Sequence, residues 1–112
     1  MGLLNVMKNS DIEKITNIIV KTAMPERIYL FGSYASGTPH SVSDYDIYVV
    51  VPDNSERPAK ITESIYHALY KQTGKKPVDI LVKHISDFES RKTLPTIERE
   101  VFTKGVVLYG NI

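Results

Sequence analysis

The chain contains no cysteine among its 112 residues. Disulfide bonds, zinc sites built on thiolates and cysteine nucleophiles are therefore excluded. The absence fits the reducing conditions of the cytoplasm, and we expect the protein to be located there.

Long hydrophobic runs are missing too. No apolar stretch approaches the roughly 20 residues that a helix needs to cross a bilayer. The apolar residues at positions 1–7 are too few for a signal peptide, and Asp11 and Glu13 follow them closely. We therefore expect neither a leader sequence nor a membrane partner.

An excess of one charge sign is also absent. The 14 Lys and Arg residues against 13 Asp and Glu residues give a net charge of +1. This balance excludes strongly basic nucleic-acid coat proteins and acidic tail proteins, and we expect no direct nucleic-acid partner. Because 42% of the residues are apolar, a chain of this length suits one compact core, and we expect a single domain over residues 1–112.

Short runs of β-branched and aromatic residues predict strands, and stripes of isoleucine predict helices between them. The expected strands cover residues 27–31, 44–51, 78–82 and 106–109. The first helix should end at Pro25, and a second should run from Ile61 towards Gly74. This alternation favours an α/β (α+β) fold in which helices flank a small mixed β-sheet.

The last helical region is marked by a capping-box spacing from Ser86 to Glu89. A helix should follow, and it contains Ile97 and Val101 four residues apart. Gly105 is expected at its C-terminal end.

Three aspartates lie in otherwise apolar strands. Asp44 and Asp46 are two residues apart, so their side chains should point to the same face. Asp79 should point away from its neighbours Val78 and Ile80, and it can join the pair if the two strands are adjacent. Each aspartate alone would also suit an exposed strand end or edge. Together, three carboxylates that repel one another could hold two Mg²⁺ ions.

The segment upstream supports the metal interpretation. Gly32 and Ser33 directly follow the first expected strand, and ten residues separate Ser33 from Asp44. A glycine lets backbone amides approach a phosphate closely, and a serine hydroxyl adds a donor. A lone Gly-Ser pair is usually a simple turn, but a Gly-Ser after a strand, then Asp-x-Asp, then a third strand aspartate is a specific combination.

Two segments carry a resemblance to a known family. FGSYASG at residues 31–37 and SDYDI at residues 43–47 resemble the signature of the DNA polymerase β nucleotidyltransferase superfamily. The short length and the ending KGVVLY at residues 104–109 are similar to its minimal nucleotidyltransferase branch. The resemblance spans roughly residues 11–110, with a motif core at 28–82, and implies a polymerase β-like nucleotidyltransferase fold.

The resemblance also implies a role for each motif residue. Gly32 and Ser33 would hold the β- and γ-phosphates of a nucleoside triphosphate. Asp44 and Asp46 would bind Mg²⁺, while Asp79 would bind a second ion and help deprotonate the acceptor hydroxyl. That hydroxyl would attack the α-phosphorus and release pyrophosphate.

Minimal nucleotidyltransferases resemble this chain in having no domain of their own for the acceptor. They are typically encoded beside a helical HEPN-type toxin, a ribonuclease, and act as its antitoxin. The resemblance therefore implies transfer of AMP from ATP to a tyrosine of such a partner. Two alternatives remain open, namely transfer to a small molecule such as an aminoglycoside, and a non-catalytic module that binds the toxin.

Four of the seven tyrosines fall at informative positions. Tyr29 and Tyr48 lie in expected strands and should be half-buried. Tyr66 and Tyr70 are four residues apart on an expected helix, where they should lie at the edge of the core. A contact with another protein is the alternative for this pair.

Overall fold

The computed structural model describes residues 10–32, 35, 45–72 and 78–110. Its strands are β1 (Arg27–Phe31), β2 (Tyr45–Val51), β3 (Val78–His84) and β4 (Val106–Tyr109). Its helices are α2 (Ser10–Ala23), α4 (Pro58–Gln72), α5 (Ile85–Arg91) and α6 (Ile97–Lys104). No helix in these ranges has both the length and the apolar character that a membrane crossing requires.

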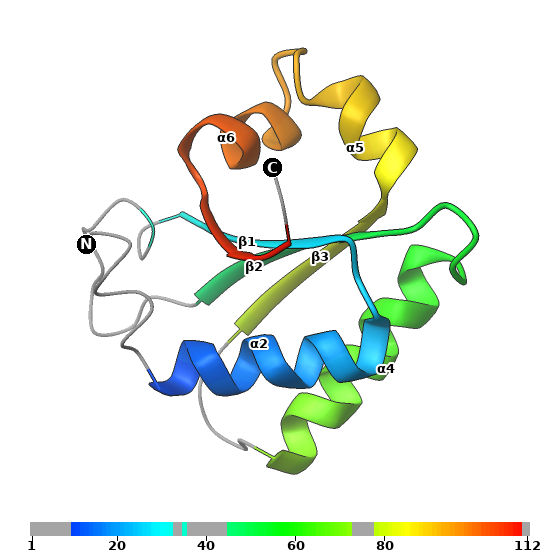
Figure 1. The fold of residues 1–112 in the computed structure, drawn as a ribbon, viewed down its shortest axis with the longest axis vertical. Helices are drawn as coiled ribbons and strands as arrows, with labels where there is room; N and C mark the ends of the chain where they lie inside the picture. The colour runs from blue at the N-terminus through cyan, green and yellow to red at the C-terminus, as the bar shows by residue number, and fades with distance from the viewer. Residues whose placement is uncertain (1–9, 33–34, 36–44, 73–77, 111–112) are drawn as a thin grey trace.

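The described strands form one mixed sheet in the order β3-β2-β1-β4 (Figure 1). β1 pairs antiparallel with both β2 and β4, whereas β2 and β3 pair parallel. A parallel pair needs a long crossover, and α4 supplies it. The predicted α+β fold with a small mixed sheet is therefore confirmed.

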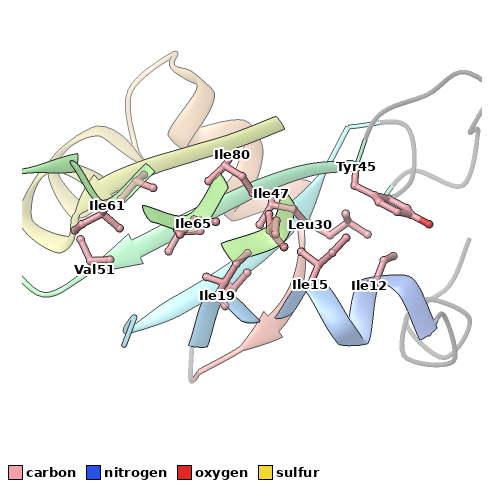
Figure 2. Close-up of a cluster of buried hydrophobic side chains, with 14 residues drawn as sticks. Ile12, Ile15, Ile19, Leu30, Tyr45, Ile47, Val51, Ile61, Ile65 and Ile80 are labelled. Atoms are coloured by element: carbon pink, nitrogen blue, oxygen red, sulfur yellow. The ribbon is translucent and has the colours of Figure 1, made fainter. Parts of the chain in front are cut away.

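The larger core lies between the sheet and the helices α2 and α4, which cover one face (Figures 1 and 2). Each helix presents one apolar stripe at helical spacing to the sheet. The stripe residues are Ile12, Ile15 and Ile19 of α2, and Ile61, Ile65 and Leu69 of α4. They pack on Leu30, Ile47 and Ile80 among others, and α2 ends just before Pro25, as predicted.

The smaller core lies on the opposite face, beneath α5 and α6. Phe88 of α5 stacks on Tyr29, with ring centroids 5.6 Å apart, and lies 5.3 Å from the ring of Tyr48. Val50 and Val101 complete this cluster. The expectation that Tyr29 and Tyr48 are half-buried is wrong, because α5 and α6 cover both side chains fully.

Strand β3 is longer than predicted. Lys83 and His84 continue the parallel ladder opposite Val50 and Val51, where residue 82 was the expected end. β3 therefore extends as far as its pairing partner β2, although the last two residues of β3 are polar.

The capping box expected at Ser86 does not form. Helix α5 already begins at Ile85, and the Ser86 amide donates to Oδ1 of Asp53, 3.0 Å away in the segment between β2 and α4. Helix α6 is separate and is capped by Thr96, whose side chain accepts from the Arg99 amide at 3.3 Å. A distant side chain thus replaces the local cap that the spacing suggested.

Helix α6 buries a charged residue and exposes an apolar one. Ile97 is 45% exposed, whereas Glu98 is only 1% exposed and shares the buried face with Val101. Gly105 ends the helix with an extended backbone rather than a left-handed one. It is needed for space, because a Cβ at this position would collide with the carbonyl oxygen of Val101.

Candidate functional site

Three predicted site residues meet at one end of the sheet. Gly32 directly follows β1, and its neighbour Phe31 pairs with Asp46 at the beginning of β2. Asp46 in turn lies opposite Asp79 at the beginning of β3. Because β1 is antiparallel to β2 and β3 is parallel to β2, the C-terminal end of β1 and the N-terminal ends of β2 and β3 lie at the same end of the sheet (Figure 1).

The two carboxylates share one face of the sheet. Val78 and Ile80 pack into the core under α2 and α4, so Asp79 between them points to the opposite side. Its register partner Asp46 points to the same side, in line with Tyr48 of the smaller core. A slip of one residue would bury Asp79 among isoleucines, and the apolar pattern therefore specifies this register strongly.

Gly32 lies directly against Asp46. Its φ of 76° is in the left-handed region that glycine adopts without strain. A Cβ at Gly32 would lie closer to Oδ2 of Asp46 than real Cβ atoms approach any atom. Any larger residue would therefore have to displace the carboxylate.

The two aspartates differ in their surroundings. Asp46 is partly buried, whereas Asp79 is exposed and forms no hydrogen bond or ion pair with a described residue. Carboxylate oxygens on adjacent strands are the hard donors that Mg²⁺ prefers, so the two residues fit a divalent cation. Ser33 and Asp44, the other predicted site residues, lie outside the described residues. Within the described residues, no three His, Cys, Asp or Glu side chains form a metal-binding group.

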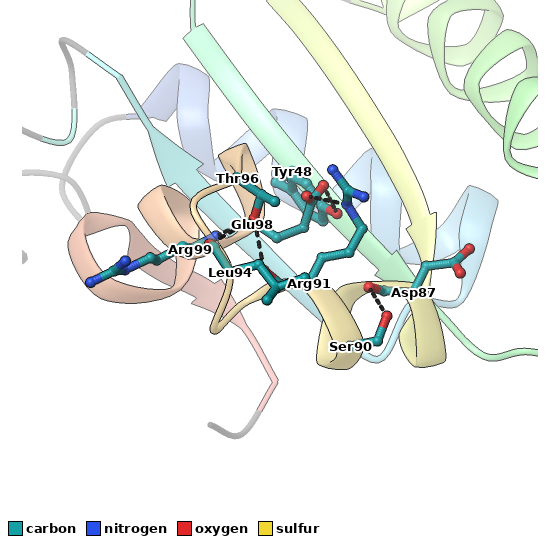
Figure 3. Close-up of polar contacts among 8 residues, drawn as sticks. All are labelled: Tyr48, Asp87, Ser90, Arg91, Leu94, Thr96, Glu98 and Arg99. Carbon is teal, nitrogen blue, oxygen red and sulfur yellow. Dashed lines mark hydrogen bonds and ion pairs between the residues drawn. The ribbon is translucent and has the colours of Figure 1, made fainter.

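A third acidic residue of this face, Glu98, was missed by the sequence reasoning. The Tyr48 hydroxyl donates to Oε2 of Glu98 at 2.9 Å, and Nε of Arg91 donates to Oε1 at 2.9 Å (Figure 3). Both carboxylate oxygens of Glu98 are thus satisfied by the chain itself. These two hydrogen bonds, which form a Tyr48–Glu98–Arg91 network, connect α5 and α6 to β2, the strand that carries Asp46.

Burial and hydrogen bonding act in opposite directions on Glu98. Burial alone would raise the pKa of its carboxyl group, but the hydrogen bonds from Arg91 and Tyr48 outweigh it and lower the pKa below its usual value. Burial and the neighbouring Glu98 carboxylate together raise the pKa of the Tyr48 hydroxyl far above its usual value. Glu98 is therefore charged and Tyr48 neutral at physiological pH.

A second ion-pair group joins β1 to α5 on the same face. Nη2 of Arg27 lies 2.9 Å from Oε1 of Glu89, which also pairs with Lys92. The hydrogen bond from Lys92 is the main cause that lowers the pKa of the Glu89 carboxyl group. These acidic side chains are already neutralised by the protein, which sets them apart from Asp79.

The polymerase beta nucleotidyltransferase family model matches residues 13–111, nearly the whole chain. The chain belongs to the polymerase beta nucleotidyltransferase family. This membership confirms the resemblance that the FGSYASG and SDYDI segments carry, and the mixed sheet with its flanking helices agrees with the family's fold. A comparison with curated protein sequences gave no match.

Several solved structures resemble the chain over most of its length. A chain of a toxin–antitoxin crystal structure with AMP-PNP has 28% identity and a TM-score of 0.60, covering 88% of this chain and 73% of that one. A chain of a mutant of the toxin–antitoxin MntA-HpeT has 28% identity and a TM-score of 0.55, with 88% and 72% covered. A chain assigned to a nucleotidyltransferase from Sulfolobus solfataricus has 18% identity and a TM-score of 0.62, with 97% and 84% covered, and supports the fold alone.

Proposed function

We propose that this nucleotidyltransferase moves AMP from ATP to a hydroxyl of a partner protein in a Mg²⁺-dependent reaction. The acceptor in this proposal is a tyrosine of a HEPN-type toxin ribonuclease, and the chain acts as the antitoxin. Residues 1–112 form one nucleotidyltransferase domain with its motif core at 28–82.

The observation that carries this proposal is the arrangement of Gly32, Asp46 and Asp79 at one end of the sheet. The support for a toxin partner and for an adenine nucleotide is the 28% identity to a chain of a toxin–antitoxin crystallised with AMP-PNP. A module that only bound its partner would have no need for two facing carboxylates beside a left-handed glycine.

Each motif residue has a defined task in this reaction. Gly32 and Ser33 hold the β- and γ-phosphates of ATP through backbone amides and a hydroxyl. Asp44, Asp46 and Asp79 would hold two Mg²⁺ ions, which supply positive charge against the charge that develops on the phosphate oxygens.

Asp79 has a second task because it is exposed at the site. It accepts the proton of the acceptor hydroxyl, whose oxygen forms the new bond to the α-phosphorus. The bond from the α-phosphorus to the bridging oxygen breaks, and pyrophosphate leaves with that oxygen. The acceptor gains one AMP, and the reaction needs no other reactant.

An intact-mass measurement tests the proposal. The chain is co-expressed with the protein encoded next to it, supplied with ATP and Mg²⁺, and compared with an Asp46→Asn variant treated alike. We expect the partner to gain whole AMP units only with the unmutated chain, and digestion should locate the AMP on a tyrosine. Thermal unfolding of the variant checks that its fold is intact.

The contrary outcomes point to the two alternatives. A stable complex without any mass change would replace the enzyme proposal with a non-catalytic toxin-binding module. If no complex forms, small molecules such as aminoglycosides become the acceptors to test, and the protein-transfer proposal is abandoned.

A further inference from the structure

Asp79 lies on an edge strand. In the described sheet, β3 has β2 on one side only, whereas β2, which carries Asp46, is held between β1 and β3. Edge strands expose unpaired amides and are less constrained than central strands. The sheet alone therefore constrains the backbone of Asp46 more than the backbone of Asp79.

A tyrosine from α4 reaches this open edge. The Ile80 amide donates to the Tyr66 hydroxyl at 2.8 Å, so that N–H points away from β2. The peptide bond that donates joins Asp79 to Ile80, directly beside the Asp79 Cα. Helix α4 is fixed against the sheet by Ile65 and Leu69, which are buried on either side of Tyr66 in the sequence.

We propose that Tyr66 is a positioning residue that holds the backbone of Asp79 in register for nucleotidyl transfer. This inference rests on the proposed function. No strand lies beyond β3 in the described sheet, and Tyr66 accepts the hydrogen bond that such a strand would otherwise accept from the amide next to Asp79. It does not touch the nucleotide or the acceptor; it acts through Asp79.

Tyr70 offers a matched control. It lies one turn after Tyr66 on α4, is 79% exposed against 40% for Tyr66, and forms no hydrogen bond with a described residue. Replacing either tyrosine by phenylalanine removes the same single oxygen atom. Only Tyr66→Phe removes a hydrogen bond to the strand of Asp79.

The first experiment measures transfer of AMP to the co-purified partner protein with ATP and Mg²⁺. Tyr66→Phe should lower kcat about tenfold, because small displacements of a reacting group are costly, while KM for ATP changes less than twofold. Tyr70→Phe should match the unmutated chain. In an Asp79→Asn background, Tyr66→Phe should cause no additional loss.

The double variant separates positioning from general stability. If Tyr66 only protects the sheet edge, its loss lowers activity by the same factor with Asp79 or Asn at position 79, and the inference is overturned. It is also overturned if Tyr66→Phe and Tyr70→Phe behave alike.

A second experiment needs no transfer activity. Amide hydrogen exchange by NMR should show the Ile80 amide exchanging at least tenfold faster in Tyr66→Phe, with the central-strand Val49 amide unchanged. A Mg²⁺ titration in the presence of AMP-PNP should show weaker Mg²⁺ binding in Tyr66→Phe than in Tyr70→Phe. If the unmutated chain transfers no AMP but both effects are seen, the proposed function fails and the positioning role stands. If neither effect is seen, the positioning role is overturned whatever the activity.

Discussion

Two acidic residues on the same face of the sheet, Glu98 and Asp79, have opposite surroundings. Glu98 is buried, and Tyr48 and Arg91 donate to its two oxygens. Asp79 is exposed at the beginning of an edge strand and has no hydrogen-bonding or ion-pair partner among the described residues. The chain thus neutralises one carboxylate itself and leaves the other available to something from outside.

This difference distinguishes Glu98, a structural acid, from Asp79, which we propose is a functional one. A buried carboxylate must be satisfied by the protein, since an unpaired buried charge is strongly destabilising. An exposed carboxylate beside another one adds little to stability and is suited to a cation or a proton. The four predictions below test this separation.

The largest effect is expected from Asp79→Asn. Loss of the base should lower the rate of AMP transfer by about 10²–10⁴-fold. The free energy of unfolding should change by less than about 0.5 kcal/mol, because the side chain is exposed and unpaired. Asp87→Asn, an exposed aspartate of α5, serves as the control and should keep full activity. A destabilised Asp79→Asn variant would make Asp79 a structural residue like Glu98.

A second test compares two glycines with left-handed backbones, Gly32 (φ 76°) and Gly110 (φ 91°). A Cβ at Gly32 would displace Asp46, whereas at Gly110 it would meet the carbonyl of Glu26, outside the site. The left-handed backbone alone should cost alanine roughly 1–2 kcal/mol in unfolding free energy at either position. The total loss of stability should be larger in Gly110→Ala, because the added Cβ there meets backbone rather than a movable side chain. Transfer activity per folded molecule should fall at least tenfold only in Gly32→Ala. Equal activity in the two variants would show that Gly32 is merely a turn residue.

Tyr48→Phe should have the reverse profile. Removing the donor leaves one oxygen of buried Glu98 unsatisfied, which should cost about 1–3 kcal/mol in urea unfolding. The transfer rate of the folded protein should stay within about twofold of the unmutated value, because Tyr48 belongs to the smaller core and is not one of the proposed site residues. Tyr109→Phe, at a partly exposed tyrosine of β4, should leave both quantities unchanged. If Tyr48→Phe instead lost most of its activity at full stability, the Tyr48–Glu98–Arg91 network would have a role in the reaction.

The smallest effect concerns acid unfolding. The pKa of Glu98 is lower in the folded protein than its usual value, so its charge stabilises the fold above the unfolded-state pKa of about 4.3. This contribution is lost as the pH falls through the folded-state pKa. The difference in melting temperature between the unmutated chain and Glu98→Gln should therefore be largest near pH 7 and shrink towards pH 3. For Glu100→Gln, on the exposed side of α6, we expect little difference at any pH.

Local patterns predicted much of the fold. Short-range periodicity predicted the bounds of β1, and it predicted that Asp79 and Ile80 point to opposite faces of the sheet. The geometry of proline predicted that α2 ends before Pro25. These features depend on neighbours in the chain, which a sequence displays directly.

The features that were missed depend on distant partners. Glu98 was not recognised as a buried residue of α6, because its burial depends on the Tyr48 hydroxyl and the Arg91 guanidinium. The pairing of Asp46 with Asp79 was conditional, because residue spacing alone does not say which strands are adjacent. Their roles, and those of Gly32, Ser33 and Asp44, remain predictions that the variants above test.

The parallel pairing of β2 with β3 also has a consequence for how the protein folds. β1 and β2 pair as antiparallel neighbours in sequence, whereas α4 lies between β2 and β3 in the chain, so the β2–β3 pairing closes a longer loop. Pairings of this kind close late during folding, because a long loop must be ordered first. A newly made chain whose last strands have not yet docked therefore holds Asp46 without Asp79. The carboxylate pair is therefore complete only when β3 lies beside β2 and Ile80 joins the larger core.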